Sequence, residues 1–388
     1  MPHIRPNDSL SRRRFGKLSA AALGYSMIPT AASRGASADS DRDSTRPKRE
    51  PPRPQLPDDE KLGIALVGLG NYATNQLRPA LEETGFCKLS GIVTGTPQKA
   101  VDWTARYPEL EGHVYNYETY DRIADDDAID VIYVVLPNSM HAEYTVRAAE
   151  AGKHVICEKP MALTADEAQT MIDACDGAER RLFIGYRLHF EPHNMEAMRR
   201  GQSGALGNIK VIENAFGFRI GEPTQWRLKM ALAGGGAMMD VGIYALQAAR
   251  YVTGEEPVEV TAQEFKTDPQ KFAEVDETLT WQMTFPSGCV ANCGTSYATY
   301  TERLYASGDR GWIELRPSYG YGGIAGRASD GPLDFPAVNQ QAHHMDGCAQ
   351  AIMNGEELRC EGREGWRDLV VIDAIYESIR NGGAKVRI

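Results

Sequence analysis

The chain has 388 residues, with 42 basic and 53 acidic side chains and a formal net charge of -11. At 42% hydrophobic residues it can bury the cores of roughly two domains, so extensive disorder is excluded. The acidic balance argues against a nucleic-acid partner, and the absence of any run of about 18 apolar residues argues against a membrane span.

Residues 1–38 have the pattern of an export signal. They hold six basic side chains and one acid, Asp8. Residues 11–17 (SRRRFGK) resemble the twin-arginine motif, a weakly apolar stretch follows at 18–29, and Ala-Ser-Ala at 36–38 suits a signal peptidase. We expect export by the twin-arginine route to the periplasm or otherwise outside the cytoplasm. A disordered basic tail is the alternative.

Residues 39–60 are polar and rich in proline, and they predict an extended N-terminal arm or a plain spacer. Seven cysteines are scattered through the chain without a CxxC pair, so we interpret most of them as small buried apolar residues. His189 and His193 have i, i+4 spacing, but no carboxylate–histidine motif accompanies them. The sequence therefore predicts no metal site.

A nucleotide-binding turn follows the arm. An apolar strand is predicted over 61–67, and the segment Gly68-Leu69-Gly70-Asn71-Tyr72-Ala73 leads from it into a helix that reaches about residue 83. In this G-x-G-x-x-A pattern Gly68 permits the tight turn, Gly70 admits the pyrophosphate, and Ala73 allows helix and strand to pack closely.

Strands and helices then alternate. Strands are predicted over 89–94, 131–136, 154–157 and 182–185, with helices over 98–107, 141–151 and 165–178. This order is typical of a parallel, doubly wound sheet with a Rossmann topology, which we assign to residues 61–184.

The end of the second strand indicates which dinucleotide binds. An NAD site places a carboxylate there, whereas this chain has Thr94-Gly95-Thr96 with Lys99 one helical turn later. Hydroxyls and an ammonium group suit a 2′-phosphate, so the pattern favours NADP over NAD. The alternative is that Lys99 is an ordinary solvated lysine.

Three further motifs are specific in combination: 136–141 (LPNSMH), 157–162 (CEKPMA) and 234–244 (GGGAMMDVGIY). With the glycine fingerprint, they resemble the Gfo/Idh/MocA oxidoreductase family over about residues 61–380. Within it the chain is most similar to the glucose–fructose oxidoreductase branch, which also combines a twin-arginine signal with a Pro-rich arm.

The resemblance implies a C-terminal α+β domain, residues 185–388, with a large open antiparallel sheet for substrate binding and oligomerisation. Predicted strands over 209–218, 258–265, 278–285, 289–296 and 312–316 support it. In this family the open sheet commonly mediates oligomerisation, so a homo-oligomer, dimer or tetramer, is expected. In the glucose–fructose branch the arm embraces a neighbouring subunit.

The resemblance also supplies the catalytic residues. Lys159 matches the family's catalytic lysine, and Tyr244 matches the tyrosine acid/base of the glucose–fructose branch. A nearby Lys159 would stabilise the phenolate of Tyr244. Asp240, four residues before Tyr244, would share its helix face and orient Lys159 or the sugar hydroxyls. A structural aromatic and a helix N-cap are the alternatives for Tyr244 and Asp240.

Further cofactor contacts are expected after other strand ends and at positions that match the family. They are Tyr117, Leu136, Pro137, Asn138, His141, Glu158, Arg187, Trp226, Arg227 and Tyr321. We expect His141 to be a contact rather than a catalyst. Core packing and a surface charge are the alternatives for Arg187, Trp226 and Arg227.

Together these features predict an NADP-dependent sugar oxidoreductase that moves a hydride from aldose C1 to a tightly held NADP, gives a lactone and reduces a second sugar. A dehydrogenase with a dissociable NAD(P) and a non-catalytic sugar or nucleotide sensor are the alternatives. A loop at 217–223 and a C-terminus that are both short for the glucose–fructose branch leave the sugar pair open.

Overall fold

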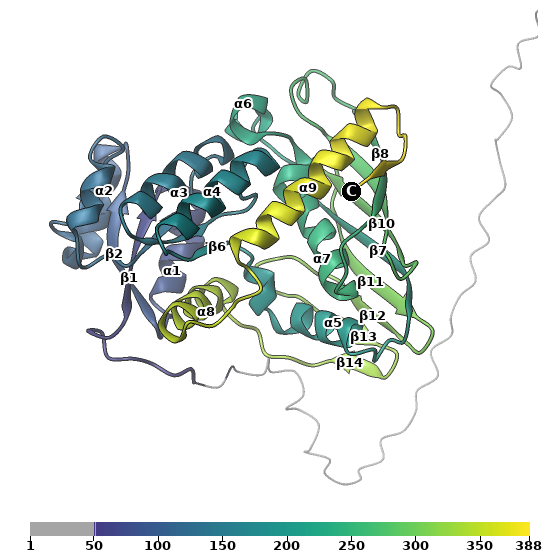
Figure 1. Cartoon of the computed structure of the whole chain (residues 1–388), viewed down its shortest axis with the longest axis horizontal. Helices are drawn as coiled ribbons and strands as arrows, with labels where there is room; N and C mark the ends of the chain where they lie inside the picture. The colour runs from purple at the N-terminus through teal and green to yellow at the C-terminus, as the bar shows by residue number, and fades with distance from the viewer. Residues whose placement is uncertain (1–49, 51) are drawn as a thin grey trace, which may run out of the picture. The chain divides into compact units, whose positions relative to one another are not determined.

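The computed structural model describes Glu50 and residues 52–388, which belong to one compact unit with two β-sheets (Figure 1). The predicted export signal at 1–38 and the first part of the predicted arm lie outside the described residues. Within the described part of the chain, no helix has both the length and the apolar character that crossing a membrane requires.

The first sheet is parallel and has six strands in the order β3-β2-β1-β4-β5-β6. The strands are β1 (Leu62–Val67), β2 (Cys87–Val93), β3 (Val114–Tyr115), β4 (Val131–Val134), β5 (His154–Cys157) and β6 (Leu182–Ile184). Helices α2 (Pro97–Arg106), α3 (His141–Glu150) and α4 (Ala165–Gly177) connect them. The central strands are buried along most of their length, as expected for a sheet covered on both faces. The predicted Rossmann topology is confirmed.

The segment after the fingerprint is helical over residues 71–81, close to the predicted end at about residue 83, but it is not a regular α-helix throughout. A π-helical turn, Ala73–Leu77, comes first, and the regular helix α1 is only Arg78–Leu81. Pro79 has no N–H to donate within a regular α-helix, which agrees with the irregular turn directly before it.

The second sheet has nine strands in the order β14-β13-β12-β11-β7-β10-β9-β8-β15. Five of them match predicted strands: β7 (Ile209–Gly217), β8 (Glu259–Phe265), β9 (Thr278–Thr284), β10 (Val290–Ser296) and β12 (Trp312–Leu315). The others are β11 (Thr301–Gly308), β13 (Gly326–Ala328), β14 (Gly331–Leu333) and β15 (Val386–Arg387). Neighbouring described strands run antiparallel except for β7 and β10, so the sheet is mostly antiparallel.

Side chains alternate between the two faces of this sheet. On β9 the side chains of Leu279, Trp281 and Met283 are buried, whereas those of Thr280 and Gln282 are exposed. The apolar face packs against helices α7 (Ile243–Thr253) and α9 (Gly362–Arg380), which lie on one side of the sheet (Figure 1). The other face is open and polar.

Helix α8 (Gln340–Asn354) and the segment before α9 return to the first sheet. Asp346 on α8 accepts hydrogen bonds from the backbone N–H groups of Gly85 and Phe86, and the N–H of Ile184 donates to the carbonyl of Cys360 at 2.7 Å. The described end of the arm packs on the same helix, since Arg53 donates to Asp346 at 2.8 Å. The segment before α9 therefore bonds to β6, the strand at one edge of the first sheet, and α8 packs beside the start of β2.

Candidate active site

One cavity of about 620 Å³ lies at the carboxyl ends of strands β1, β2, β4 and β5, and the π-helical turn Met238–Gly242 before α7 forms part of its wall. Carboxyl ends of parallel strands are where α/β proteins bind nucleotides. The predicted site residues that line it are Gly68, Leu69, Gly70, Asn71, Tyr72, Thr94, Gly95, Thr96, Lys99, Tyr117, Leu136, Pro137, Asn138, His141, Glu158, Lys159, Trp226, Arg227, Asp240, Tyr244 and Tyr321.

The glycine fingerprint has the space that a dinucleotide requires. Gly68 has φ +95°, and a Cβ there would meet the carbonyl oxygen of Val135 at 2.5 Å. A Cβ on Gly70 would meet no atom within 4 Å, so its backbone remains open to a ligand on the cavity side. Ala73 is fully buried and does not line the cavity, which agrees with its expected packing role. These residues fit a bound pyrophosphate.

The end of β2 forms a small polar recess. Thr94 is buried, and its Oγ1 accepts a hydrogen bond from the N–H of Thr96 at 3.2 Å. Gly95 lies against the ring of Tyr117, where a Cβ would come within 2.9 Å of the ring. Lys99 is exposed in the first turn of α2, and no carboxylate occurs between Thr94 and Lys99. The recess therefore offers hydroxyl and ammonium groups and no repelling charge to a 2′-phosphate.

The three predicted catalytic residues meet at the other end of the cavity. Nζ of Lys159, just after β5, donates to the backbone carbonyl of Asp240 at 2.5 Å and lies 3.3 Å from its Oδ1. The same Nζ is 4.8 Å from the ring centroid of Tyr244 in the first turn of α7. Burial alone lowers the pKa of Lys159, but Tyr244 and Asp240 outweigh it and the net pKa shift is upward. Lys159 is therefore held as an ammonium group.

Asp240 has two further partners. Nε of Arg227 is 3.2 Å from its Oδ2, and the hydroxyl of Tyr297 donates to that oxygen at 2.9 Å. Burial works to raise the pKa of Asp240, whereas the charges of Lys159 and Arg227 and the hydrogen bond from Tyr297 lower it below its usual value. The carboxylate stays ionised between two cations.

Arg187 lies beneath the cavity wall rather than in it. Its side chain is almost fully buried and donates to the carbonyl of Tyr319 and to the side chain of Gln340. Its guanidinium lies 5.2 Å from the ring centroid of Tyr244 and 4.4 Å from that of Tyr321. Arg187 was predicted to contact the cofactor directly, but it does not line the cavity and instead packs against two tyrosines that do. Its position is fixed by hydrogen-bond acceptors more than 130 residues away in the sequence.

Three other predicted residues line the cavity and also form hydrogen bonds that hold the surrounding structure together. Asn138 donates to the carbonyl of Ala233 at 2.8 Å, which joins the two halves of the chain. The ring of His141 lies 2.9 Å from each of the carbonyl oxygens of Leu136 and Pro160. Glu158 accepts a hydrogen bond from Tyr133 at 2.8 Å, and burial raises its pKa. His141 lines the cavity, and backbone carbonyl groups hold both nitrogens of its ring.

The cavity also has a cover that comes from the second sheet. Tyr321, in the loop between β12 and β13, lies with its ring centroid 6.0 Å from that of Tyr72 in the fingerprint. The loop that carries Tyr321 is held in place by two hydrogen bonds, because the side chains of Arg187 and Gln340 both donate to the carbonyl of Gly320. A dinucleotide would be enclosed between this loop and the first sheet.

Some lining residues were missed by the sequence analysis: Gln76, Val135, Ala233, Gly235, Gly236, Met239 and Tyr297. Gly235, Gly236 and Met239 belong to the motif at 234–244, where only the aspartate and the tyrosine were assigned roles. Tyr297 directly follows a predicted strand, and a polar residue at a strand end is the signal that could have indicated it.

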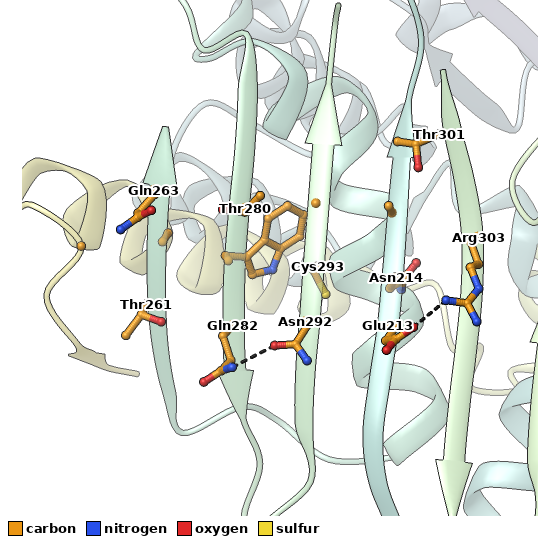
Figure 2. A pocket seen from close by; sticks show the side chains of 15 residues that line it. Glu213, Asn214, Thr261, Gln263, Thr280, Gln282, Asn292, Cys293, Thr301 and Arg303 are labelled. Carbon is orange, nitrogen blue, oxygen red and sulfur yellow. Dashed lines mark hydrogen bonds and ion pairs between the residues drawn. The ribbon is translucent and has the colours of Figure 1, made fainter. Parts of the chain in front are cut away.

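A second cavity, of about 700 Å³, lies on the open face of the nine-stranded sheet and shares no lining residue with the first. Figure 2 shows its polar side chains on neighbouring strands. Gln282 donates to Asn292 at 2.8 Å, and Arg303 pairs with Glu213 at 2.5 Å. It carries none of the residues assigned to catalysis.

Comparison with known proteins identifies the family. A family model described as an oxidoreductase family with an NAD-binding Rossmann fold matches residues 62–186, and a GFO/IDH/MocA C-terminal domain model matches residues 195–314. The chain belongs to the GFO/IDH/MocA oxidoreductase family. The resemblance predicted from the sequence is confirmed.

Relatives within the GFO/IDH/MocA family act on sugars. The chain is 31% identical to the D-xylose 1-dehydrogenase (NADP(+)) of Haloarcula marismortui over 84% of this chain and 92% of that protein. The crystal structure of an aldose-aldose oxidoreductase from Caulobacter crescentus, complexed with glycerol, is 45% identical with a TM-score of 0.82, over 84% of this chain and 100% of that one. A 3-ketoreductase from Actinomadura kijaniata, at 23% identity and a TM-score of 0.70 over 82% of this chain and 98% of that one, shares the fold.

Proposed function

We propose that this enzyme oxidises an aldose at C1 to a lactone with an NADP that it retains, and then reduces a second carbonyl sugar with the same cofactor. The observation that carries the proposal is the cluster of Lys159, Asp240 and Tyr244 at the carboxyl edge of the parallel sheet. The likeness to an aldose-aldose oxidoreductase and to an NADP(+) D-xylose dehydrogenase supports the substrate class and the cofactor.

The described residues divide the binding of NADP between them. The backbone at Gly68 and Gly70 would hold the pyrophosphate, and Thr94, Thr96 and Lys99 would hold the 2′-phosphate. When bound, the nicotinamide accepts and returns a hydride. The side chains of this chain then need only to position the sugar and move its hydroxyl proton.

The phenol of Tyr244 is the group proposed to move that proton. As C1–H leaves as a hydride, the C1 hydroxyl gives its proton to the phenolate oxygen of Tyr244, and the C1=O bond of the lactone forms. The ammonium of Lys159 stabilises the negative charge on the phenolate oxygen of Tyr244 and on the sugar oxygen at C1. Asp240 holds Lys159 in place. In the reductive half-reaction, Tyr244 returns the proton to the carbonyl oxygen of the second sugar.

The enzyme is proposed to keep its cofactor bound between turnovers and to act outside the cytoplasm. The ring pair of Tyr321 and Tyr72 over the fingerprint supports slow release of the dinucleotide. Retention suits an enzyme exported by the twin-arginine route, because no free NADP pool exists outside the cytoplasm. A conventional dehydrogenase that exchanges its cofactor is the second candidate, supported by the likeness to the D-xylose dehydrogenase.

The polar open face of the nine-stranded sheet is the proposed interface of a homo-oligomer. Its exposed alternate residues (Thr280, Gln282 and Asn292) offer hydrogen-bonding groups over several neighbouring strands. A non-catalytic sensor is disfavoured, because the complete cluster of Lys159, Asp240 and Tyr244 would serve no purpose in it.

The Tyr244→Phe variant tests the chemistry. The phenol cannot take up the proton in this variant, so we expect the rate of nicotinamide reduction by an aldose to fall by about 10²–10⁴-fold. The amount of dinucleotide that stays with the protein through gel filtration, measured by mass spectrometry, should not change. Tyr305→Phe, on strand β11, is the matched control.

Undiminished hydride transfer in Tyr244→Phe would remove this residue from its proposed role. Loss of all dinucleotide from the wild-type protein on gel filtration, together with activity that requires added NADP, would favour the exchanging dehydrogenase.

A further inference from the structure

Three side chains that could bind a metal ion lie together outside the active-site cavity. His344 and Cys348 are one turn apart on α8, and Cys360 lies just before α9. One ring nitrogen of His344 and the two Sγ atoms all lie within 4.8 Å of one another. The exposed fractions of His344, Cys348 and Cys360 are 1%, 0% and 0%.

The donor set and its spacing suit a thiophilic divalent cation. Zinc binds cysteine sulfur at about 2.3 Å and histidine nitrogen at about 2.0–2.1 Å, so neighbouring tetrahedral donors lie about 3.5–3.8 Å apart. Nε2 of His344 is 3.6 Å from Sγ of Cys348. Two thiolates would balance the two charges of the ion, so binding leaves no net charge in this buried place.

We propose that His344, Cys348 and Cys360 form a structural site for a zinc ion, with the carbonyl oxygen of Ile184 as the fourth donor. That oxygen lies 3.0 Å from Nε2 of His344 and accepts its hydrogen bond in the metal-free arrangement. The two thiol protons leave as the ion enters, and the imidazole stays neutral by changing to the tautomer with its proton on Nδ1, which frees Nε2 to bind. Four protein donors make a closed site without a position for substrate.

The site's position indicates what the ion would do. It would join α8, the segment before α9 and the end of β6, which already meet through the bond from the N–H of Ile184 to the carbonyl of Cys360. None of the three side chains lines the active-site cavity. The ion would therefore stabilise the fold and would take no part in the proposed chemistry.

The experiment measures zinc in the purified full-length chain and in variants of it. We expect about one zinc per chain after gel filtration in metal-free buffer, and titration of the stripped protein with Co²⁺ should give thiolate-to-cobalt charge-transfer absorption. Cys348→Ala and Cys360→Ala should each weaken zinc binding by more than about 100-fold. Loss of a residue that only hydrogen-bonds to a metal ligand costs about 10–100-fold. Cys175→Ala, which removes another buried thiol on α4, should bind zinc as the wild type does.

Wild-type measurements decide the matter even if a variant does not fold. Removing zinc with a chelator should lower the melting temperature of the wild type, and restoring Zn²⁺ should recover it. A wild-type chain without zinc and without cobalt charge transfer overturns the proposal. So does a peptide map that links Cys348 to Cys360 by a disulfide.

Discussion

At the scale of single residues, the carboxylate of Asp240 organises the catalytic end of the cavity. Lys159, Arg227 and Tyr297 approach it from three separate parts of the chain. Its pKa is lowered in the folded protein, so it stabilises the fold above its unfolded pKa of about 4. This stability is lost as the pH falls through the lower folded value.

The Tyr297→Phe variant tests how far this arrangement depends on hydrogen bonding. The variant removes a donor to the ionised form, so the pKa of Asp240 should rise and the acid limb of the kcat/KM profile should move upward by about one pH unit. Tyr300→Phe, at an exposed position three residues on, should leave the profile unchanged. An unmoved acid limb in Tyr297→Phe would show that its hydroxyl does not control Asp240.

At the scale of elements, two π-helical turns both border the active-site cavity. One, Ala73–Leu77, follows the glycine fingerprint, and the other, Met238–Gly242, carries Asp240 just before α7. A π-turn adds a residue to the helical turn, and such turns are frequent at functional sites. Both helices therefore begin irregularly where they border the cavity.

The end of β6 offers a prediction about packing. A Cβ on Gly185 would come within 2.6 Å of the Glu158 carboxylate, whereas one on Gly177, at the end of α4, would meet nothing within 4 Å. Gly185→Ala should lower the free energy of unfolding by about 1–3 kcal/mol through overpacking. Gly177→Ala should be neutral or stabilise by up to about 1 kcal/mol.

Urea denaturation midpoints compare these two alanine variants with the wild type. Equal midpoints for Gly185→Ala and Gly177→Ala would contradict the close approach of Glu158 to β6.

The sequence predicted most of the parallel sheet because buried strands there are short apolar runs separated by helices. It also predicted most residues of the cavity, since they follow strand ends or lie in local motifs. Strand β11, Thr301–Gly308, was missed because its segment TERLYASG has a weak apolar alternation, and pairing with β7 and β12 decides its conformation. The burial of Arg187 was missed because Gln340 and Tyr319 are remote in sequence.

At the scale of the whole molecule, the open face of the nine-stranded sheet is a broad polar surface. If a second copy of the chain packed on this face, a lysine introduced there would be buried without an opposite charge to pair with, which would destabilise the interface. If this face holds the proposed homo-oligomer together, Thr280→Lys should give a monomer where the wild type is larger, as measured by light scattering during gel filtration. Gln98→Lys, on the exposed side of α2, is the control. An unchanged mass for Thr280→Lys would place the interface elsewhere.

The return of the chain's last third to the first sheet has a consequence for the order of synthesis. Strand β6 and Arg187 emerge from the ribosome early, but their partners at Gln340 and Cys360 are made more than 150 residues later. The nucleotide-binding half cannot complete its edge while translation is under way. Until Gln340 is made, the guanidinium of Arg187 and the carbonyl of Gly320 each lack one hydrogen-bond partner, so the loop that carries Tyr321 is not yet fully fixed over the cavity.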